Sequence, residues 1–264
     1  MRFAIGIEYD GTAYNGWQRQ RAGVGVQSVI EQALTKVADH GVELTCAGRT
    51  DTGVHAVGQV AHFDSASERS LRGWVLGANS NLPDDVNVLW AKPVPDSFHA
   101  RFSALARTYR YLILNRLVRS ALFRRRAWWV HQTLDEQRMR AAGESLLGEH
   151  DFSAFRAAGC QAATAVRELT ALKVSRCDDW VAVTVRANAF LQHMVRNIVG
   201  TLVAVGNGDR PVGWVAQLLR GRDRAQGGVA APAHGLTLVR VDYPSEFGIP
   251  TPDVDDPPPA LSDA

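Results

Sequence analysis

The sequence predicts a mixed α+β fold (α/β mixed) of two lobes, each with the order β-α-β-β-α-β, and a central cleft between them. Two observations support this prediction. Short segments alternate between apolar and polar residues, as half-buried strands do, and segments with helical apolar spacing lie between them. The same order occurs in both halves of the 264-residue chain, although the sequence itself does not repeat. Such an order is typical of the ferredoxin-like arrangement, and clefts between lobes are common binding sites.

The first lobe is expected to span residues 1–103. Within it, Ser28 and Glu31 have the spacing of a capping box, which marks the start of a helix. In chain order, the expected elements are a strand at 2–9, a helix at 28–38, strands at 42–47 and 57–63, a helix at 71–79 and a strand at 86–92.

The second lobe is expected to span residues 104–245. Its elements are expected as a strand at 108–115, a helix at 134–147, a hairpin of strands 169–175 and 180–187, helices at 191–205 and 212–219, and a closing strand at 236–241. The remaining residues, 246–264, are rich in proline and aspartate, so we expect a disordered tail.

Composition and cysteine usage narrow the class of protein. The first residues lead directly into an alternating strand without a signal-peptide pattern, and no apolar run approaches the ~18 residues that a membrane span needs. Cys46, Cys160 and Cys177 are scattered and do not have the spacing of a zinc site or a disulfide framework. We therefore expect a cytoplasmic protein with reduced thiols and no membrane association.

The positive charge of the chain is unevenly distributed. The formal net charge is only +2, yet no acidic residue lies between Asp96 and Asp135. That interval combines eight arginines with aromatic and histidine side chains: Arg101, Arg107, Arg110, Arg116, Arg119, Arg124, Arg125, Arg126, Phe98, His99, Phe102, Tyr109, Tyr111, Trp128 and Trp129. Positive charge attracts phosphate, and flat side chains stack on unpaired bases, so the interval favours a polyanion surface. The alternative is a solvated basic face with the aromatics in the core.

The segment from Cys46 to Ala56 has the strongest signal for chemistry. Asp51 and Arg49 lie between Gly48 and Gly53, in a tight loop that joins two expected strands. A loop held by strands at both ends is a rigid platform on which a carboxylate could act as a nucleophile. The alternative is a β-turn whose aspartate only binds its own backbone amides.

Other kinds of catalytic site have little support in the sequence. His55 and His62 do not have the spacing of a zinc site, no glycine-rich phosphate loop precedes a helix, and no serine elbow occurs. We therefore expect no metal and no small-molecule cofactor. Arg196 lies in an expected helix that is otherwise apolar, where a buried guanidinium would need a partner such as a carboxylate.

Taken together, the motifs resemble the TruA family of tRNA pseudouridine synthases. The resemblance covers about residues 3–243 and rests on many segments in order: Gly6-Ile7-Glu8-Tyr9-Asp10-Gly11, Gly16-Trp17-Gln18-Arg19-Gln20, Ala47-Gly48-Arg49-Thr50-Asp51, Gly53-Val54-His55, Phe98-His99-Ala100-Arg101-Phe102-Ser103, Arg107-Thr108-Tyr109-Arg110-Tyr111, Asp151-Phe152-Ser153-Ala154-Phe155-Arg156, and residues 189–200.

The resemblance implies the pseudouridine synthase fold and conversion of uridine to pseudouridine at positions 38, 39 and 40 of the tRNA anticodon stem-loop, without a cofactor. It implies that Asp51 is the nucleophile, that Arg49 replaces the flipped base in the stem, that Tyr109 packs on the target base, and that Arg196 pairs with the nucleophile. It also implies a homodimer. Further tRNA contacts would fall on Arg69, Phe98, His99, Ala100, Arg101, Phe102, Gly159, Cys160, Gln161, Ala162 and Ala163.

The chain departs from the family pattern in two places. Thr52 stands where a small alanine is common, and the stretch 116–126 matches only loosely, so it could form either a subunit interface or an RNA face. Two other functions fit parts of the sequence. A non-catalytic RNA-binding protein would account for the basic aromatic interval, and a glycoside hydrolase or base-excision glycosylase would account for a reactive carboxylate.

Overall fold

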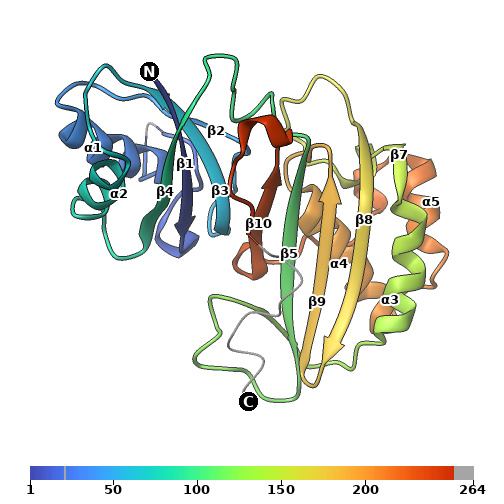
Figure 1. The fold of residues 1–264 in the computed structure, drawn as a ribbon. Coiled ribbons are helices and arrows are strands. Elements are labelled where there is room, and N and C mark those ends of the chain that lie inside the picture. The colour runs from blue at the N-terminus through green and yellow to red at the C-terminus, as the bar shows by residue number, and fades with distance from the viewer. Residues whose placement is uncertain (21, 253–264) are drawn as a thin grey trace. The chain divides into compact units, whose positions relative to one another are not determined.

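The computed structural model describes residues 1–20 and 22–252, and within these it forms two compact units (Figure 1). Unit 1 comprises Met1–Arg107 and the described residues from Thr237 on, and unit 2 comprises Thr108–Leu236. The described residues form ten strands and five α-helices, which confirms the mixed α+β class. No helix in this part of the chain combines the length and hydropathy that crossing a bilayer requires.

Unit 1 is a sheet with two helices on one face. The sheet has the strand order β4-β1-β3-β10, in which β1 is antiparallel to β3 and β4, and β10 is parallel to β3. Its elements are β1 (Arg2–Tyr9), α1 (Val26–Ala38), β2 (Thr45–Cys46), β3 (His55–Asp64), α2 (Leu71–Asn79), β4 (Val86–Val94) and β10 (Leu236–Asp242). The core forms where Trp74 of α2 packs on Phe3 and Phe63, with ring centroids 5.4 and 5.1 Å away.

Unit 2 contains the strands β5-β9-β8-β7, paired in that order, with β6 paired in parallel with β5. Its elements are β5 (Ala106–Asn115), β6 (Trp128–Val130), α3 (Glu136–Gly143), β7 (Gly148–Asp151), β8 (Val166–Cys177), β9 (Trp180–Ala187), α4 (Met194–Gly206) and α5 (Trp214–Gly221). Alternate residues of β9 are buried, as expected for a strand with one face on the core. The expected hairpin is confirmed: β8 and β9 are antiparallel, and Asp178 turns between them with a φ of 50°.

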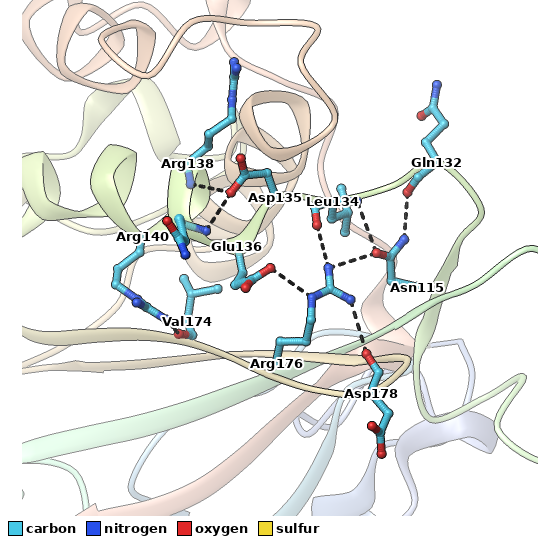
Figure 2. A network of polar contacts seen from close by, with 11 residues as sticks. Asn115, Gln132, Leu134, Asp135, Glu136, Arg138, Arg140, Val174, Arg176 and Asp178 are labelled. Atoms are coloured by element: carbon cyan, nitrogen blue, oxygen red, sulfur yellow. Dashed lines mark hydrogen bonds and ion pairs between the residues drawn. The ribbon is translucent and has the colours of Figure 1, made fainter.

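Arg176, near the end of β8, ties several elements of unit 2 together (Figure 2). Its guanidinium donates to Glu136 Oε2 in the first turn of α3 at 2.9 Å, to the Leu134 carbonyl at 2.6 Å and to Asn115 Oδ1 at 3.0 Å. Asp135 caps the same helix by accepting from the backbone N–H groups of Gln137 and Arg138. The start of α3 is thereby fixed to the ends of β5 and β8.

The predicted capping box is wrong. Helix α1 begins at Val26 after the cap residue Gly25, so Ser28 lies inside the helix. Glu31 is buried, and its carboxylate accepts from the backbone N–H of Leu44 at 2.9 Å instead. The same contact shortens the next strand: Leu44 and Val42 donate to side chains of α1, so β2 contains only Thr45–Cys46 rather than 42–47.

The helix expected at 191–205 starts later, because His193 has the left-handed φ of 61° and α4 begins at Met194. The closing strand forms, but β10 pairs in parallel with β3 and groups with unit 1, whereas the expected lobes were 1–103 and 104–245. Of the expected tail, residues 246–252 are described: the Phe247 ring lies 5.1 Å from that of Phe98, and Lys92 Nζ donates to Gly248 O at 2.6 Å. Residues 253–264 lie outside the described residues.

Candidate active site

Asp51 lies in the loop between β2 and β3 of unit 1. Its side chain is half-buried, whereas that of Arg49 is exposed. The Val54 N–H donates to the Asp51 carbonyl at 3.1 Å, and Gly53 has a φ of 78° that favours glycine. The loop therefore turns tightly directly after the carboxylate, as expected at Gly53.

Contacts from three other segments hold this loop in place. The Trp17 N–H donates to Thr50 O at 3.0 Å, and the Tyr9 hydroxyl lies 2.8 Å from Thr50 Oγ1. Gln59 of β3 is fully buried and donates from Nε2 to Gly48 O at 2.7 Å. Since both neighbours of Arg49 are fixed by their carbonyls, the backbone that carries Asp51 is preorganised.

Glycine is required where the chain passes closest to this loop. A Cβ on Gly16 would lie 2.6 Å from Thr50 O, and the φ of Gly16 is +88°. A Cβ on Gly11 would lie 2.0 Å from Val54 O. These two contacts give a physical reason for the glycines in the first two motifs of the sequence analysis.

The turn at 98–104 combines buried and exposed residues. Phe98 and Ala100 are fully buried, so they shape the turn rather than face solvent. Arg101 and Phe102 are exposed, and Phe102 reaches 75% exposure. The rings form a series: His62 and His99 lie 4.8 Å apart, His99 and Phe102 lie 4.3 Å apart, and the Arg101 guanidinium lies 5.5 Å from the Phe102 ring.

Both histidines of this series favour the neutral form. Burial, with help from the nearby Arg2 charge, lowers the pKa of His62 to about 4. Burial likewise lowers the pKa of His99. His62 Nδ1 accepts from the Ala100 N–H at 3.1 Å, and His55 Nδ1 accepts from the Gly11 N–H at 3.0 Å. His62 and His55 thus each have a backbone partner. Within the described residues, no group of three or more His, Cys, Asp or Glu could hold a metal ion.

Arg69 lies at the entry to α2 in unit 1. Its Nε donates to Val37 O near the end of α1 at 3.0 Å, and its side chain is otherwise exposed. The residue therefore links the two helices while keeping part of its guanidinium in solvent.

Tyr109 and Arg196 belong to unit 2. Tyr109 is 7% exposed, and its ring packs edge-to-face on Phe190 at 5.1 Å. Arg196 is half-buried near the start of α4, where its Nε donates to Ala231 O at 2.8 Å. That contact is to a main-chain carbonyl, so the predicted pairing of Arg196 with a carboxylate stays a prediction.

The loop containing residues 159–163 is also in unit 2. Arg156 Nη2 donates to Cys160 O at 2.6 Å and to Ala162 O at 2.8 Å, which fixes the loop from within. Gly159, Gln161 and Ala163 are exposed. Burial opposes ionisation of the Cys160 thiol, but the hydrogen bonds from the Ala162 and Gln192 backbones and the Arg156 charge outweigh it, so its pKa is lowered.

Arg107 lies elsewhere than the sequence predicted. It was grouped with the arginines of an expected polyanion surface, but it is 8% exposed and donates to Ala47 O directly before the Asp51 loop. The signal that could have found it is its position at the start of a strand whose first four residues are all buried. Tyr111 and Phe98 of the same interval are also core residues, as the alternative interpretation held.

Comparisons with known proteins identify the family of the chain. The family model described as tRNA pseudouridine synthase matches residues 5–103 and 142–244, which include Asp51, Arg101 and Arg196. The chain belongs to the tRNA pseudouridine synthase family. Members of this family are isomerases, so the chain is an enzyme of that class.

Individual relatives of this pseudouridine synthase match along nearly the whole chain. Proteins named tRNA pseudouridine synthase A from Hydrogenovibrio crunogenus, Coxiella burnetii and Aeromonas hydrophila are 55%, 53% and 54% identical to it. The alignments cover 94–95% of this chain and 93–95% of each relative. One chain in the crystal structure of a Cbf5-Nop10-Gar1 complex aligns with 76% of this chain. The alignment covers 45% of the chain in the complex, with 13% sequence identity and a TM-score of 0.33.

Proposed function

We propose that this enzyme isomerises uridine to pseudouridine at positions 38, 39 and 40 of the tRNA anticodon stem-loop, with Asp51 as the nucleophile. The observation that carries the proposal is the preorganised Asp51 loop in a member of this family. The named relatives support tRNA as the substrate. The proposal includes a homodimer that acts in the cytoplasm and needs no cofactor.

Base flipping is the first step of the proposed reaction. The target uracil is stacked within an RNA helix, and extruding it costs a few kcal/mol, which pocket contacts offset. Arg49 is exposed beside the fixed Thr50, which supports the proposal that its side chain fills the position that the base leaves. Exposed Arg101 and Phe102, together with Arg69 and the 159–163 loop, are proposed to hold the surrounding RNA.

Asp51 then attacks either the ribose C1′ or the uracil C6. If Asp51 attacks C1′, it displaces N1 of the uracil, the freed ring turns, and C5 attacks C1′ and displaces the carboxylate. If Asp51 attacks C6, the bond between N1 and C1′ breaks, the ring turns, C5 bonds to C1′, and loss of the C5 proton expels the carboxylate from C6. In both cases the C5 proton is released and N1 takes up a proton from solvent, so uridine and pseudouridine have the same composition. We propose that Tyr109 stacks on the base or takes up the C5 proton, and that Arg196 stabilises the Asp51 carboxylate.

The test is tritium release from tRNA transcripts that carry [5-³H]uridine, without added metal or nucleotide. Wild type should release tritium stoichiometrically with the strand intact, and Asp51→Asn should release none while binding tRNA within a few-fold of wild type. The substitution removes the nucleophile but few RNA contacts. Full activity of Asp51→Asn would exclude the nucleophile assignment. Tight binding without any product would favour an RNA-binding protein, and free uracil would favour a glycosylase.

A further inference from the structure

Arg107 connects two segments of unit 1 that the proposed function uses for different purposes. Its Nη2 donates to Ala47 O at 2.8 Å and to Arg101 O at 2.6 Å. Its Nε lies 3.3 Å from Ala47 O, and its Nη1 donates to Ala104 O at 3.1 Å. One buried guanidinium thus binds the residue before the Asp51 loop and two residues of the 98–104 turn.

Both segments have further contacts of their own, and Arg107 adds a direct link between them. Ala47, directly before the loop, donates its N–H to Val60 O of β3 at 2.8 Å. In the turn, the Ser103 N–H donates to His99 O at 2.9 Å and the Tyr243 hydroxyl donates to Ala100 O at 2.6 Å. The turn presents the exposed Arg101 and Phe102, whereas the loop presents Asp51.

The arrangement of carbonyl acceptors around Arg107 matches the donor geometry of an arginine side chain. A guanidinium is planar and has five N–H donors in a fixed fork, so it can hold carbonyls of two segments at a set distance and angle. A lysine ammonium keeps the charge but is a point donor on a flexible stem. Replacing Arg107 by lysine therefore keeps a buried cation while removing the geometry.

We propose that Arg107 is a positioning residue for the reaction. It holds the Asp51 loop at a fixed distance and orientation from the 98–104 turn, which contacts the RNA. This inference rests on the proposed function, because it assumes that Asp51 reacts and that the turn contacts tRNA. A small displacement of a reacting group can cost about 10²-fold in rate even when binding is kept. Loss of the Arg107 hydrogen bonds should therefore lower the turnover rate more than the affinity for tRNA.

The experiment compares Arg107→Lys with wild type in single-turnover tritium release and in tRNA binding, at a temperature where circular dichroism shows both folded. Arg107→Lys should slow the saturating rate by at least about ten-fold and leave the tRNA Kd within about three-fold. The matched control is Arg138→Lys, because Arg138 also donates to two main-chain carbonyls, those of Val205 and Arg210, but lies in unit 2 on α3. The control should keep the wild-type rate.

Each outcome decides the inference. A folded Arg107→Lys with a wild-type rate would overturn it, and so would an equal fall in rate with Arg138→Lys. Arg107→Gln, which can still donate from its amide, is the second variant if the lysine variant unfolds. Unfolding of both Arg107→Lys and Arg107→Gln would also overturn the inference, since Arg107 would then support the folding of unit 1 as a whole. Activity of Asp51→Asn in the same assay would instead defeat the proposed function.

Discussion

At the scale of single residues, His62 shows how a buried polar group supports the 98–104 turn. Its Nδ1 accepts from the Ala100 N–H, and its ring lies against His99. Protonation at Nδ1 would remove that acceptor. Because burial lowers the pKa of His62 to about 4, the neutral ring persists well below the pH at which a solvated histidine takes up a proton.

His62 therefore predicts a pH dependence of stability. The unfolded chain binds a proton at this histidine as pH falls through about 6.5, while the folded protein resists until about pH 4. The free energy of unfolding should fall across this window by up to about 3 kcal/mol, at 1.36 kcal/mol per pKa unit. Urea unfolding between pH 6.5 and 4.5 measures it, with His62→Gln as the comparison. Parallel curves for the two proteins would contradict the prediction.

At the scale of elements, the network around Arg176 predicts where unit 2 is sensitive to substitution (Figure 2). Arg176→Met should lower the free energy of unfolding by about 2–3 kcal/mol, because it leaves Glu136 and the Leu134 carbonyl without this donor. Lys173→Met, an exposed position on the same strand, is the control and should change stability by less than about 0.5 kcal/mol. Denaturant unfolding measures both, and equal values would contradict the prediction.

The same network adds a dependence on acid. The hydrogen bond from Arg176 lowers the pKa of Glu136. A lowered carboxyl pKa stabilises the fold above the pH at which the unfolded glutamate titrates, and this contribution is lost as pH falls through the folded pKa. Because this occurs below the range that His62 dominates, the two effects are separable.

Helices and strands were predictable from the sequence where the local pattern of apolar residues determines them. They were less predictable where contacts with distant residues determine their bounds. The alternation of β9 and the helical spacing of α2 are visible in the chain and are confirmed. The short β2 was not, because the buried carboxylate of Glu31 binds the backbone of Leu44, thirteen positions away. A polar side chain that reaches another segment has no signature in hydrophobic periodicity.

At the scale of the whole molecule, the class of fold and the Asp51 loop followed from the sequence, but the supports of that loop did not. Glycines bounded the loop, and the structure adds its anchors at Trp17, Gln59 and Arg107. Trp17 lies 34 residues before Asp51, Gln59 lies 8 residues after it, and Arg107 lies 56 residues after it. Such distances carry no local pattern, so only the folded unit could identify them.

Charge distribution gives the prediction that belongs to this scale. The net charge of +2 would by itself give little attraction for a polyanion, so tRNA affinity must come from local basic groups. Arg101 is exposed beside the Phe102 ring, where a phosphate contact would release counterions. Arg101→Ala should weaken tRNA binding and reduce the slope of log Kd against log salt by about 0.7–0.9.

The control for this prediction is Arg220→Ala, an exposed arginine in the last turn of α5. It removes the same charge from the molecule, so it separates a local phosphate contact from an effect of net charge. Binding is measured by titration at several salt concentrations. If both variants reduced the slope equally, the attraction would come from overall charge, and Arg101 would lose its place on the RNA surface. A reduced slope for Arg101→Ala alone would place a phosphate of the tRNA at the turn that Arg107 links to the residue before the Asp51 loop.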